Sequence, residues 1–224
     1  MDASRDSAVL ELSAEAAACL ASKAIDGSLV HVNERDHLQP CFSRAAKQLG
    51  PSWDQPGAPS SPRVRYDDWP KLGGVDLALT WSDGLIAFVE LKCGAGRDTL
   101  DACGWDAVKL AFALARGKAS AAYLVAGTTA ENWVYPIRGT ELFSSCEFEA
   151  TQLRTDYSDA FRMYERDGYR VATLVPERFR TMKLGAFPFA VQGNPWELRV
   201  SRVEVVGNKW AAWPPLLEGQ HGPV

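Results

Sequence analysis

The stretch from Gly74 to Lys92 decides the fold, and it reads GVDLALTWSDGLIAFVELK. Two largely apolar runs, Val75–Trp81 and Leu85–Lys92, flank the turn residues Ser82-Asp83-Gly84, a pattern that predicts a β-hairpin. Asp76 and Glu90 place charges inside these two strands. A charge in such a strand costs free energy unless it is paired or bound to a metal, so the two acids are candidate functional groups.

The length of the turn decides whether the two acids meet. A three-residue loop with Gly84 in the left-handed conformation is a common hairpin type. In that register Asp76 lies directly opposite Glu90 and points to the same side of the sheet. The β-carbons of two opposed residues are roughly 5 Å apart.

A shorter turn would separate the acids. If Asp83-Gly84 formed a two-residue turn, Asp76 would oppose Leu91 and point away from Glu90. Only the three-residue loop explains why both strands carry an acid. Lys92 follows Glu90 by two residues and therefore shares its face.

The chemistry of these residues suits a divalent cation. Two neighbouring carboxylates repel each other strongly unless a cation lies between them. Two carboxylates and a backbone carbonyl favour Mg²⁺ or Mn²⁺ over zinc. With Lys92 to orient a water, such a site has the parts needed to attack a phosphodiester. An ion pair of Lys92 with Glu90 or Asp76, without catalysis, fits the spacing equally well.

The surrounding elements predict an α/β protein with a mixed central sheet flanked by helices. With the hairpin strands included, the order of the expected elements is helix, strand, strand, strand, helix, strand. Asn33 is the expected N-cap of a helix running toward Leu49, and Pro40 marks the first regular turn after an irregular one. The other expected elements are helices at Ser7–Ala24, Thr99–Arg116 and Ser158–Gly168, strands at Arg63–Asp67, Ala121–Ala126, Tyr169–Val175 and Trp196–Val206, a loop at Pro51–Pro62, and a tail from Trp213.

These residues resemble a known family. Asp76, followed fourteen residues later by Glu90-Leu91-Lys92 on a hairpin between two helices, is similar to the PD-(D/E)XK nuclease superfamily. The resemblance covers roughly Asn33 to Gly127 and implies a restriction-endonuclease-like core. It also implies that Asp76 and Glu90 bind Mg²⁺ or Mn²⁺ and are catalytic together with Lys92.

The resemblance also implies a third acid and shows departures. Many members add a glutamate from the preceding helix, for which Glu34 is the candidate and Asp36 the alternative. Val75 stands where the family name has proline. The glutamine-and-tyrosine signature of some members is absent, and Asp106 and Lys109 stand near its place. Some members of this family have lost catalysis.

We therefore expect a divalent-metal-dependent nuclease that acts on DNA rather than RNA. The alternatives are a non-catalytic nucleic-acid- or protein-binding module that kept the fold, and another metal-dependent hydrolase. Residues 1–32 form a helical extension in this interpretation, 33–130 the core, and 131–224 a C-terminal elaboration of the same domain. The sequence leaves open whether the protein is a monomer or a homo-oligomer.

Composition restricts where a nucleic acid could bind. The 224 residues carry 24 Lys plus Arg against 28 Asp plus Glu, a net charge of −4, so a basic surface has to be local. The sequence contains one basic cluster. It is either a surface that binds phosphates or simply a solvated helical face followed by a loop. Its members are Arg162, Arg166, Arg170, Arg178, Arg180 and Lys183.

Other residues favour structural roles. Five widely spaced cysteines without a CxxC motif predict reduced, buried thiols rather than a disulfide framework. The polar start Met1–Asp6 lacks a signal-peptide pattern, and the sequence has no membrane-length apolar run, so we expect a cytoplasmic protein. His31, Glu34 and His37 fit a metal site only loosely. Trp196, Trp210 and Trp213 are expected to pack in the core rather than stack on bases.

Overall fold

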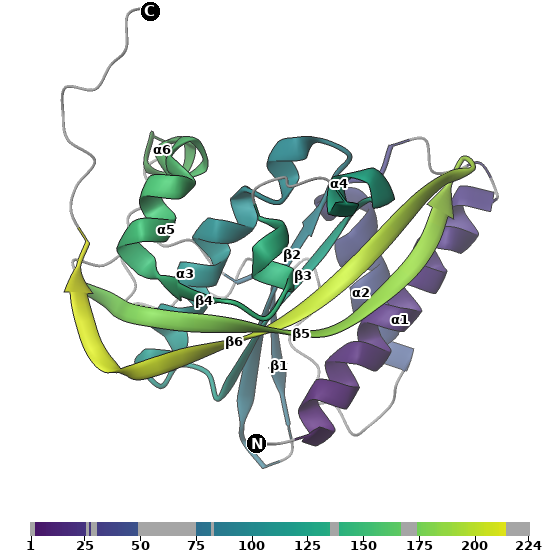
Figure 1. The fold of residues 1–224 in the computed structure, drawn as a ribbon. Coiled ribbons are helices and arrows are strands. Elements are labelled where there is room, and N and C mark those ends of the chain that lie inside the picture. Colours follow the sequence, from purple (N-terminus) through teal and green to yellow (C-terminus); the bar gives the residue numbers. More distant parts are fainter. Residues whose placement is uncertain are drawn as a thin grey trace, which may run out of the picture.

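The computed structural model describes residues 3–25, 27, 31–48, 75–81, 83–134, 139–166 and 174–213. Its centre is one six-stranded mixed sheet in the order β1-β2-β3-β6-β5-β4 (Figure 1). The predicted α/β class with a mixed central sheet is confirmed. The strands are β1 Leu77–Thr80, β2 Ile86–Cys93, β3 Ala121–Thr129, β4 Glu147–Glu149, β5 Leu174–Val191 and β6 Asn194–Ala212.

The parallel pair β2 and β3 lies beside the hairpin and needs a crossover. Helix α3, Ala102–Ala115, supplies it, because a parallel connection cannot be made by a tight turn. Strand β6 then adds antiparallel to β3 and carries the long β5–β6 hairpin. Strands β4, β5 and β6 therefore complete the same sheet that the hairpin begins.

Helices cover both faces of the sheet. Helices α1 (Ala3–Ile25) and α2 (Gln39–Gln48) lie on one face, and α3 lies on the other with α5 (Ala150–Asp156) and α6 (Ser158–Arg166) (Figure 1). Strand β2 alternates accordingly: Phe88 packs in the core under α3, and Val89 packs in the core under α1 and α2. The shorter helical turns are η1 Glu34–Leu38, η2 Arg97–Thr99, α4 Ala130–Val134 and η3 Thr140–Phe143.

The local predictions near the hairpin are confirmed within a few residues. The helices expected at Ser7–Ala24 and Thr99–Arg116 correspond to α1 and α3, and the strands expected at Ala121–Ala126 and Trp196–Val206 correspond to β3 and β6. The strand expected at Arg63–Asp67 and the loop at Pro51–Pro62 lie outside the described residues. The helix expected at Ser158–Gly168 is α6.

The C-terminal half corrects two expectations. Arg178 to Lys183 belongs to the 18-residue strand β5 and not to a loop. Register shifts between Pro176 and Arg178 and between Lys183 and Gly185 interrupt the two-residue alternation that reveals a strand in the sequence. Trp213 does not belong to a tail, because it is buried and its ring centroid lies 5.6 Å from that of Phe161.

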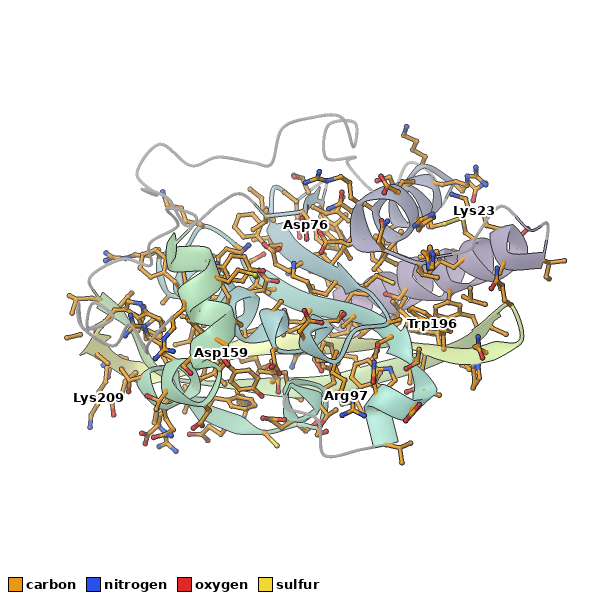
Figure 2. The ribbon with its side chains drawn as sticks, turned by 90° about the horizontal axis from the view of Figure 1, so that it is seen from above. Lys23, Asp76, Arg97, Asp159, Trp196 and Lys209 are labelled. Carbon is orange, nitrogen blue, oxygen red and sulfur yellow. A yellow bond between two sulfur atoms is a disulfide. The ribbon has the colours of Figure 1, made fainter. Side chains whose placement is uncertain are left out.

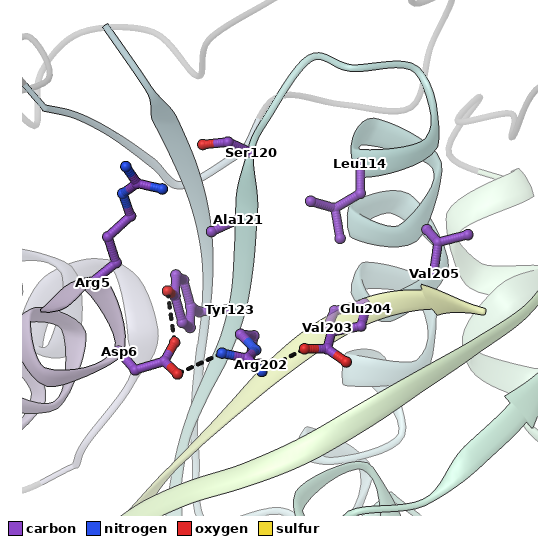
Figure 3. A pocket seen from close by; sticks show the side chains of 10 residues that line it. All are labelled: Arg5, Asp6, Leu114, Ser120, Ala121, Tyr123, Arg202, Val203, Glu204 and Val205. Atoms are coloured by element: carbon purple, nitrogen blue, oxygen red, sulfur yellow. Dashed lines mark hydrogen bonds and ion pairs between the residues drawn. The ribbon is translucent and has the colours of Figure 1, made fainter. Parts of the chain in front are cut away.

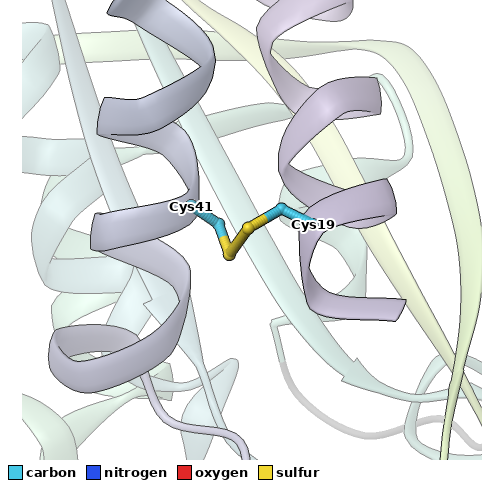
Figure 4. The surroundings of a disulfide bond; sticks show 2 residues. All are labelled: Cys19 and Cys41. Atoms are coloured by element: carbon cyan, nitrogen blue, oxygen red, sulfur yellow. A yellow bond between two sulfur atoms is a disulfide. The ribbon is translucent and has the colours of Figure 1, made fainter. Parts of the chain in front are cut away.

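A disulfide links the two helices on the α1 face, so the expectation of reduced thiols is wrong for this pair. Cys19 of α1 and Cys41 of α2 are bonded, with their α-carbons 5.7 Å apart (Figure 4). Helix packing creates this proximity, which no local cysteine motif announces. Cys93 and Cys103 are buried free thiols, as expected.

Loss of this disulfide should destabilise the protein. The bond closes a loop between residues 22 positions apart. Closing a loop of this size lowers the entropy of the unfolded chain and so raises its free energy by about 3 kcal/mol. Urea denaturation should show a loss of about 2–4 kcal/mol on reduction. The Cys19→Ser/Cys41→Ser variant should have the lower stability at once and should not respond to reductant. A variant that still loses stability with reductant would contradict this assignment.

No helix among the described residues has the length and apolarity needed to span a membrane.

Candidate functional site

The hairpin adopts the register that brings the two acids together. Leu77 pairs with Val89, so the preceding Asp76 lies opposite Glu90. Gly84 closes the turn with φ +80°, and its N–H donates to the Trp81 carbonyl at 2.9 Å. The three-residue loop is therefore confirmed, and the alternative two-residue turn is excluded.

Backbone and side-chain donors hold the Asp76 carboxylate. Its Oδ2 accepts the N–H of Leu91 at 2.9 Å, and its Oδ1 accepts the Gln39 amide at 3.0 Å. The same Gln39 nitrogen lies 3.3 Å from Glu34 Oε1. Figure 2 shows Asp76 beside the helical segment that carries these two residues. Gln39 thus ties the third acid to the first, a role that the sequence did not suggest.

An irregular helical turn delivers Glu34. Asn33 caps it by accepting the Asp36 N–H at 2.8 Å, and the turn η1 is wound as a π-helix before α2 begins. Pro40 is the second residue of α2 and follows the π-helical turn directly, and it has no N–H to continue the ladder in which the Gln39 N–H donates to the Glu34 carbonyl. The expected irregular turn is confirmed. Glu34 reaches the acids, whereas Asp36 is exposed and bonds to the Asn33 side chain.

Lys92 lies at the centre of the cluster. Its Nζ lies 3.2 Å from Glu34 Oε2 and 2.9 Å from Asp106 Oδ2, and it donates to the Leu91 carbonyl at 3.1 Å. Asp76, Glu90 and Lys92 share the face of the sheet that packs under α3. The ion-pair partners of Lys92 are therefore Glu34 and Asp106, instead of the Glu90 or Asp76 that we had considered.

Helix α3 adds a second lysine and a fourth acid. Lys109 Nζ lies 2.6 Å from Glu90 Oε1 and 3.1 Å from Asp106 Oδ1. The exposed fractions are 2% for Glu90, 1% for Asp106 and 5% for Lys109, so these three residues are buried, whereas Glu34 and Lys92 are partly exposed. The signal in the sequence was an Asp and a Lys three positions apart on an otherwise apolar helix. Such residues need partners across the interface.

We call these side chains the acid–lysine cluster: Glu34, Gln39, Asp76, Glu90, Lys92, Asp106 and Lys109. Its four carboxylates and two ammonium groups leave a formal charge of −2 when all are ionised. That surplus equals the charge of one divalent cation.

Burial and the neighbouring charges shift the pKa values of three acids of the cluster, Glu90, Glu34 and Asp106. Burial raises the pKa of Glu90 well above its ordinary 4.5, since Lys109 offsets only part of this effect and Asp76 adds to it. Burial and Asp76 likewise raise the pKa of Glu34, although Lys92 opposes them. Burial alone would raise the pKa of Asp106, but Lys92 and Lys109 lower it overall. Asp106 is the main anion that raises the pKa of Lys92, whereas Glu90 and, after it, Asp106 raise the pKa of Lys109.

An aromatic pair packs near the cluster on the α3 face. Tyr164 of α6 stacks on Trp105 of α3 with ring centroids 5.0 Å apart. Burial raises the pKa of Tyr164, and Asp106 adds to this shift, so the phenol stays protonated. This packing places Trp105 in the hydrophobic core.

The donor set fits a hard divalent cation in chemistry, although the side chains are not gathered around one point. The oxygens of Asp76, Glu90 and Glu34 are the ligand type that Mg²⁺ and Mn²⁺ prefer. Within the described part of the chain, no group of three or more His, Cys, Asp or Glu side chains has the arrangement of a metal site. Lys92 and Lys109 instead contact the carboxylates that a metal would use.

The raised pKa of Glu90 predicts a pH dependence of stability. A carboxyl whose pKa rises from 4.5 on folding adds stability below 4.5, and this contribution disappears as pH rises through the folded pKa. Glu90→Gln removes the titration. The free energy of unfolding of wild type minus that of Glu90→Gln should therefore fall as pH rises from 4.5, measured in urea without metal. A constant difference across this range would show that Glu90 does not titrate as described.

The expected basic cluster is divided between elements. Arg162 lies on α6, 3.8 Å from Asp159, while Arg178 and Arg180 of β5 pair with Glu147 and Glu204. Lys183 is exposed on β5. Arg170 and the side chain of Arg166 lie outside the described residues.

The remaining candidates have structural partners. His37 accepts the Asn33 N–H through Nδ1, and burial lowers its pKa. Trp196 packs on Phe189, and Trp210 carries the guanidinium of Arg116 over its ring. These contacts favour packing over base stacking for the two tryptophans.

A separate cavity of about 260 Å³ lies near the start of β3, away from the acid–lysine cluster (Figure 3). In it Asp6 accepts the Tyr123 hydroxyl at 3.0 Å and pairs with Arg202, which also pairs with Glu204. These contacts join the first turn of α1 to β3 and β6. Four polar side chains of this cavity therefore bind one another and connect α1 to the sheet: Asp6, Tyr123, Arg202 and Glu204.

Compared with known proteins, the chain matches no family model, no curated protein and no solved structure.

Proposed function

We propose that this protein is a divalent-metal-dependent nuclease with a restriction-endonuclease-like core, which hydrolyses phosphodiester bonds in DNA. The observation that carries the proposal is the meeting of Asp76, Glu90 and Lys92 on one face of the hairpin with Glu34 beside them. This is the arrangement that the resemblance to the PD-(D/E)XK superfamily implies. The charge of −2 that the cluster carries when all its groups are ionised adds an electrostatic reason for a divalent ion.

Each residue has a defined task in this proposal. Asp76, Glu90 and Glu34 would hold Mg²⁺ or Mn²⁺, which when bound supplies Lewis-acid catalysis and a nucleophile at neutral pH. Lys92 orients the attacking water and offsets the charge that develops on the phosphate. Gln39 keeps Asp76 and Glu34 within reach of each other.

A second candidate function also has a specific observation in its favour. The lysines already contact Glu34, Asp106 and Glu90, which is how a buried polar network stabilises a core without catalysis. In addition, Arg178 and Arg180 form ion pairs with acids. This candidate is a non-catalytic module that binds nucleic acid or protein.

A cleavage assay separates the two candidates. Wild type, freed of contaminating nuclease, is incubated with plasmid and single-stranded DNA, and with RNA, under Mg²⁺, Mn²⁺ or EDTA. The nuclease cuts only with metal and loses activity in Asp76→Asn prepared in the same way. If the wild type leaves every substrate intact, the nuclease proposal is wrong and the non-catalytic module is favoured.

Metal should stabilise the wild type through the same acids. An ion that binds only the native state at 100 times its Kd adds about 2.7 kcal/mol, or roughly 5–10 °C in Tm for a chain of this size. Asp76→Asn should abolish this response, because it removes a charge and a ligand together. The exposed substitution Asp159→Asn is the matched control and should respond as the wild type does. Equal shifts in Asp76→Asn and wild type would place the metal elsewhere.

A further inference from the structure

We propose that Lys109 is the internal counter-cation of the candidate metal site and competes with the divalent ion for Glu90, while Asp106 keeps the displaced lysine bound. This inference rests on the proposed function and adds to it a residue that controls metal affinity. Neither α3 residue was among the predicted ligands or catalytic groups.

The first observation is where Lys109 lies. Its ammonium contacts Glu90 Oε1 at 2.6 Å, on a carboxylate that the proposed site needs. With an exposed fraction of 2%, Glu90 has little access to water as an alternative partner. A divalent ion that binds Glu90 therefore has to share the carboxylate with Lys109 or take its place.

The second observation concerns the quality of this contact. Glu90 Oε1 is buried and lies within ion-pair distance of Lys109, but the contact lacks hydrogen-bond geometry. An ion pair without hydrogen-bond geometry is weaker than a well-aligned charged hydrogen bond. A cation that approaches the oxygen from another direction can therefore replace it.

The third observation is that the lysine has a second anchor. Lys109 lies 3.1 Å from Asp106 Oδ1, and Asp106 also contacts Lys92 through its other oxygen at 2.9 Å. A lysine that leaves Glu90 therefore remains paired within the protein, which avoids the cost of an unpaired buried charge. Asp106 can hold both lysines while Glu34 and Glu90 turn to a metal.

The inference predicts opposite effects for two neighbouring substitutions. Lys109→Met removes the competitor and one positive charge, so the Mn²⁺ affinity should rise at least about tenfold. Asp106→Asn removes the anchor and one negative charge, so both lysines stay on Glu34 and Glu90 and the Mn²⁺ affinity should fall at least about tenfold. A merely structural role predicts that both substitutions loosen the site and weaken binding together.

The experiment is a titration of the full chain with Mn²⁺ at one fixed pH. Binding is measured by calorimetry and by the electron paramagnetic resonance signal of free Mn²⁺. Lys109→Arg keeps the charge and should bind Mn²⁺ no more tightly than wild type. Lys47→Met, on the exposed part of α2, is the matched control and should bind as the wild type does. Circular dichroism verifies the fold, and Lys109→Gln serves as a second neutral variant.

A measurement on the wild type needs no variant to fold. In protein labelled with ¹⁵N-lysine, Mg²⁺ should shift the ammonium signal of Lys109 and leave that of Lys47 unchanged. An unmoved Lys109 signal at saturating Mg²⁺ overturns the inference.

The outcomes also separate this inference from the proposed function. If wild type binds Mn²⁺ and Lys109→Met binds it equally or more weakly, Lys109 is no competitor while the metal site stands. If wild type binds no Mn²⁺ but Lys109→Met does, the inference holds in its strongest form. If neither binds Mn²⁺, both proposals fail.

Discussion

Lys92→Ala should remove most DNA cleavage while the protein still binds metal. Lys92 is not a proposed ligand, and its Nζ is held by Glu34, Asp106 and the Leu91 carbonyl in the middle of the cluster. Loss of one positioned donor or charge at a reacting centre typically lowers kcat about 10²–10³-fold. The measurement is the single-turnover cleavage rate on labelled DNA with saturating Mg²⁺.

Two controls test whether the loss of cleavage is specific to Lys92 and separate from metal binding. Lys47→Ala removes an exposed lysine from α2 and should leave the rate unchanged. Mn²⁺ binding by Lys92→Ala should persist and should tighten, because one positive charge has left the site. DNA affinity should change little, since phosphate contacts are expected elsewhere. A Lys92→Ala variant that cleaves as fast as wild type would remove Lys92 from the mechanism.

Asp106→Ala should produce the largest loss of stability among the cluster substitutions. Asp106 is 1% exposed and pairs with both Lys92 and Lys109, so its removal leaves two buried ammonium groups with less compensation. Breaking a buried ion pair by deleting one partner costs about 3–5 kcal/mol. Urea denaturation at neutral pH, without metal, measures this loss.

The comparison is an acid that forms its pair at the surface. Asp159 lies 3.8 Å from Arg162, and its side chain is 93% exposed, so Asp159→Ala should leave the urea midpoint almost unchanged. Asp106→Asn keeps the shape of the side chain and should fall between wild type and Asp106→Ala. Equal stability of Asp106→Ala and wild type would show that the lysines do not depend on Asp106.

The pH dependence should also identify Asp106 as the stabilising acid. Its pKa lies below the ordinary 3.8, because the two lysines outweigh the effect of burial. The stability that it contributes is therefore present above 3.8 and is lost as pH falls through the lower, folded pKa. Glu90 has the opposite sign, which is why the two buried acids respond to pH in opposite directions.

The sequence by itself determined the hairpin and the meeting of its two acids. Both follow from short-range rules: alternation of two residues along a strand, and a glycine with positive φ in a three-residue loop. The irregular turn before Pro40 followed from the same kind of local signal, an N-cap at Asn33 and a proline inside the helical pattern, whereas Glu34 became the third acid only through the family resemblance. These features depend on neighbours within a few positions, which any single sequence displays.

Only the tertiary structure decided which groups hold those acids. Gln39 lies 37 positions before Asp76, Lys109 lies 19 positions after Glu90, and Cys19 and Cys41 come from different helices. Such pairs form because α2 and α3 pack on the sheet at one particular rotation and depth, which no local pattern specifies. The strand expected at Tyr169–Val175 overlaps β5 only at Leu174 and Val175. The rest of β5 escaped prediction for a related reason, since pairing with β6 across two register shifts sustains its 18 residues where the alternation fails. Local patterns thus placed the acids, and long-range packing chose the lysines and the amide that surround them.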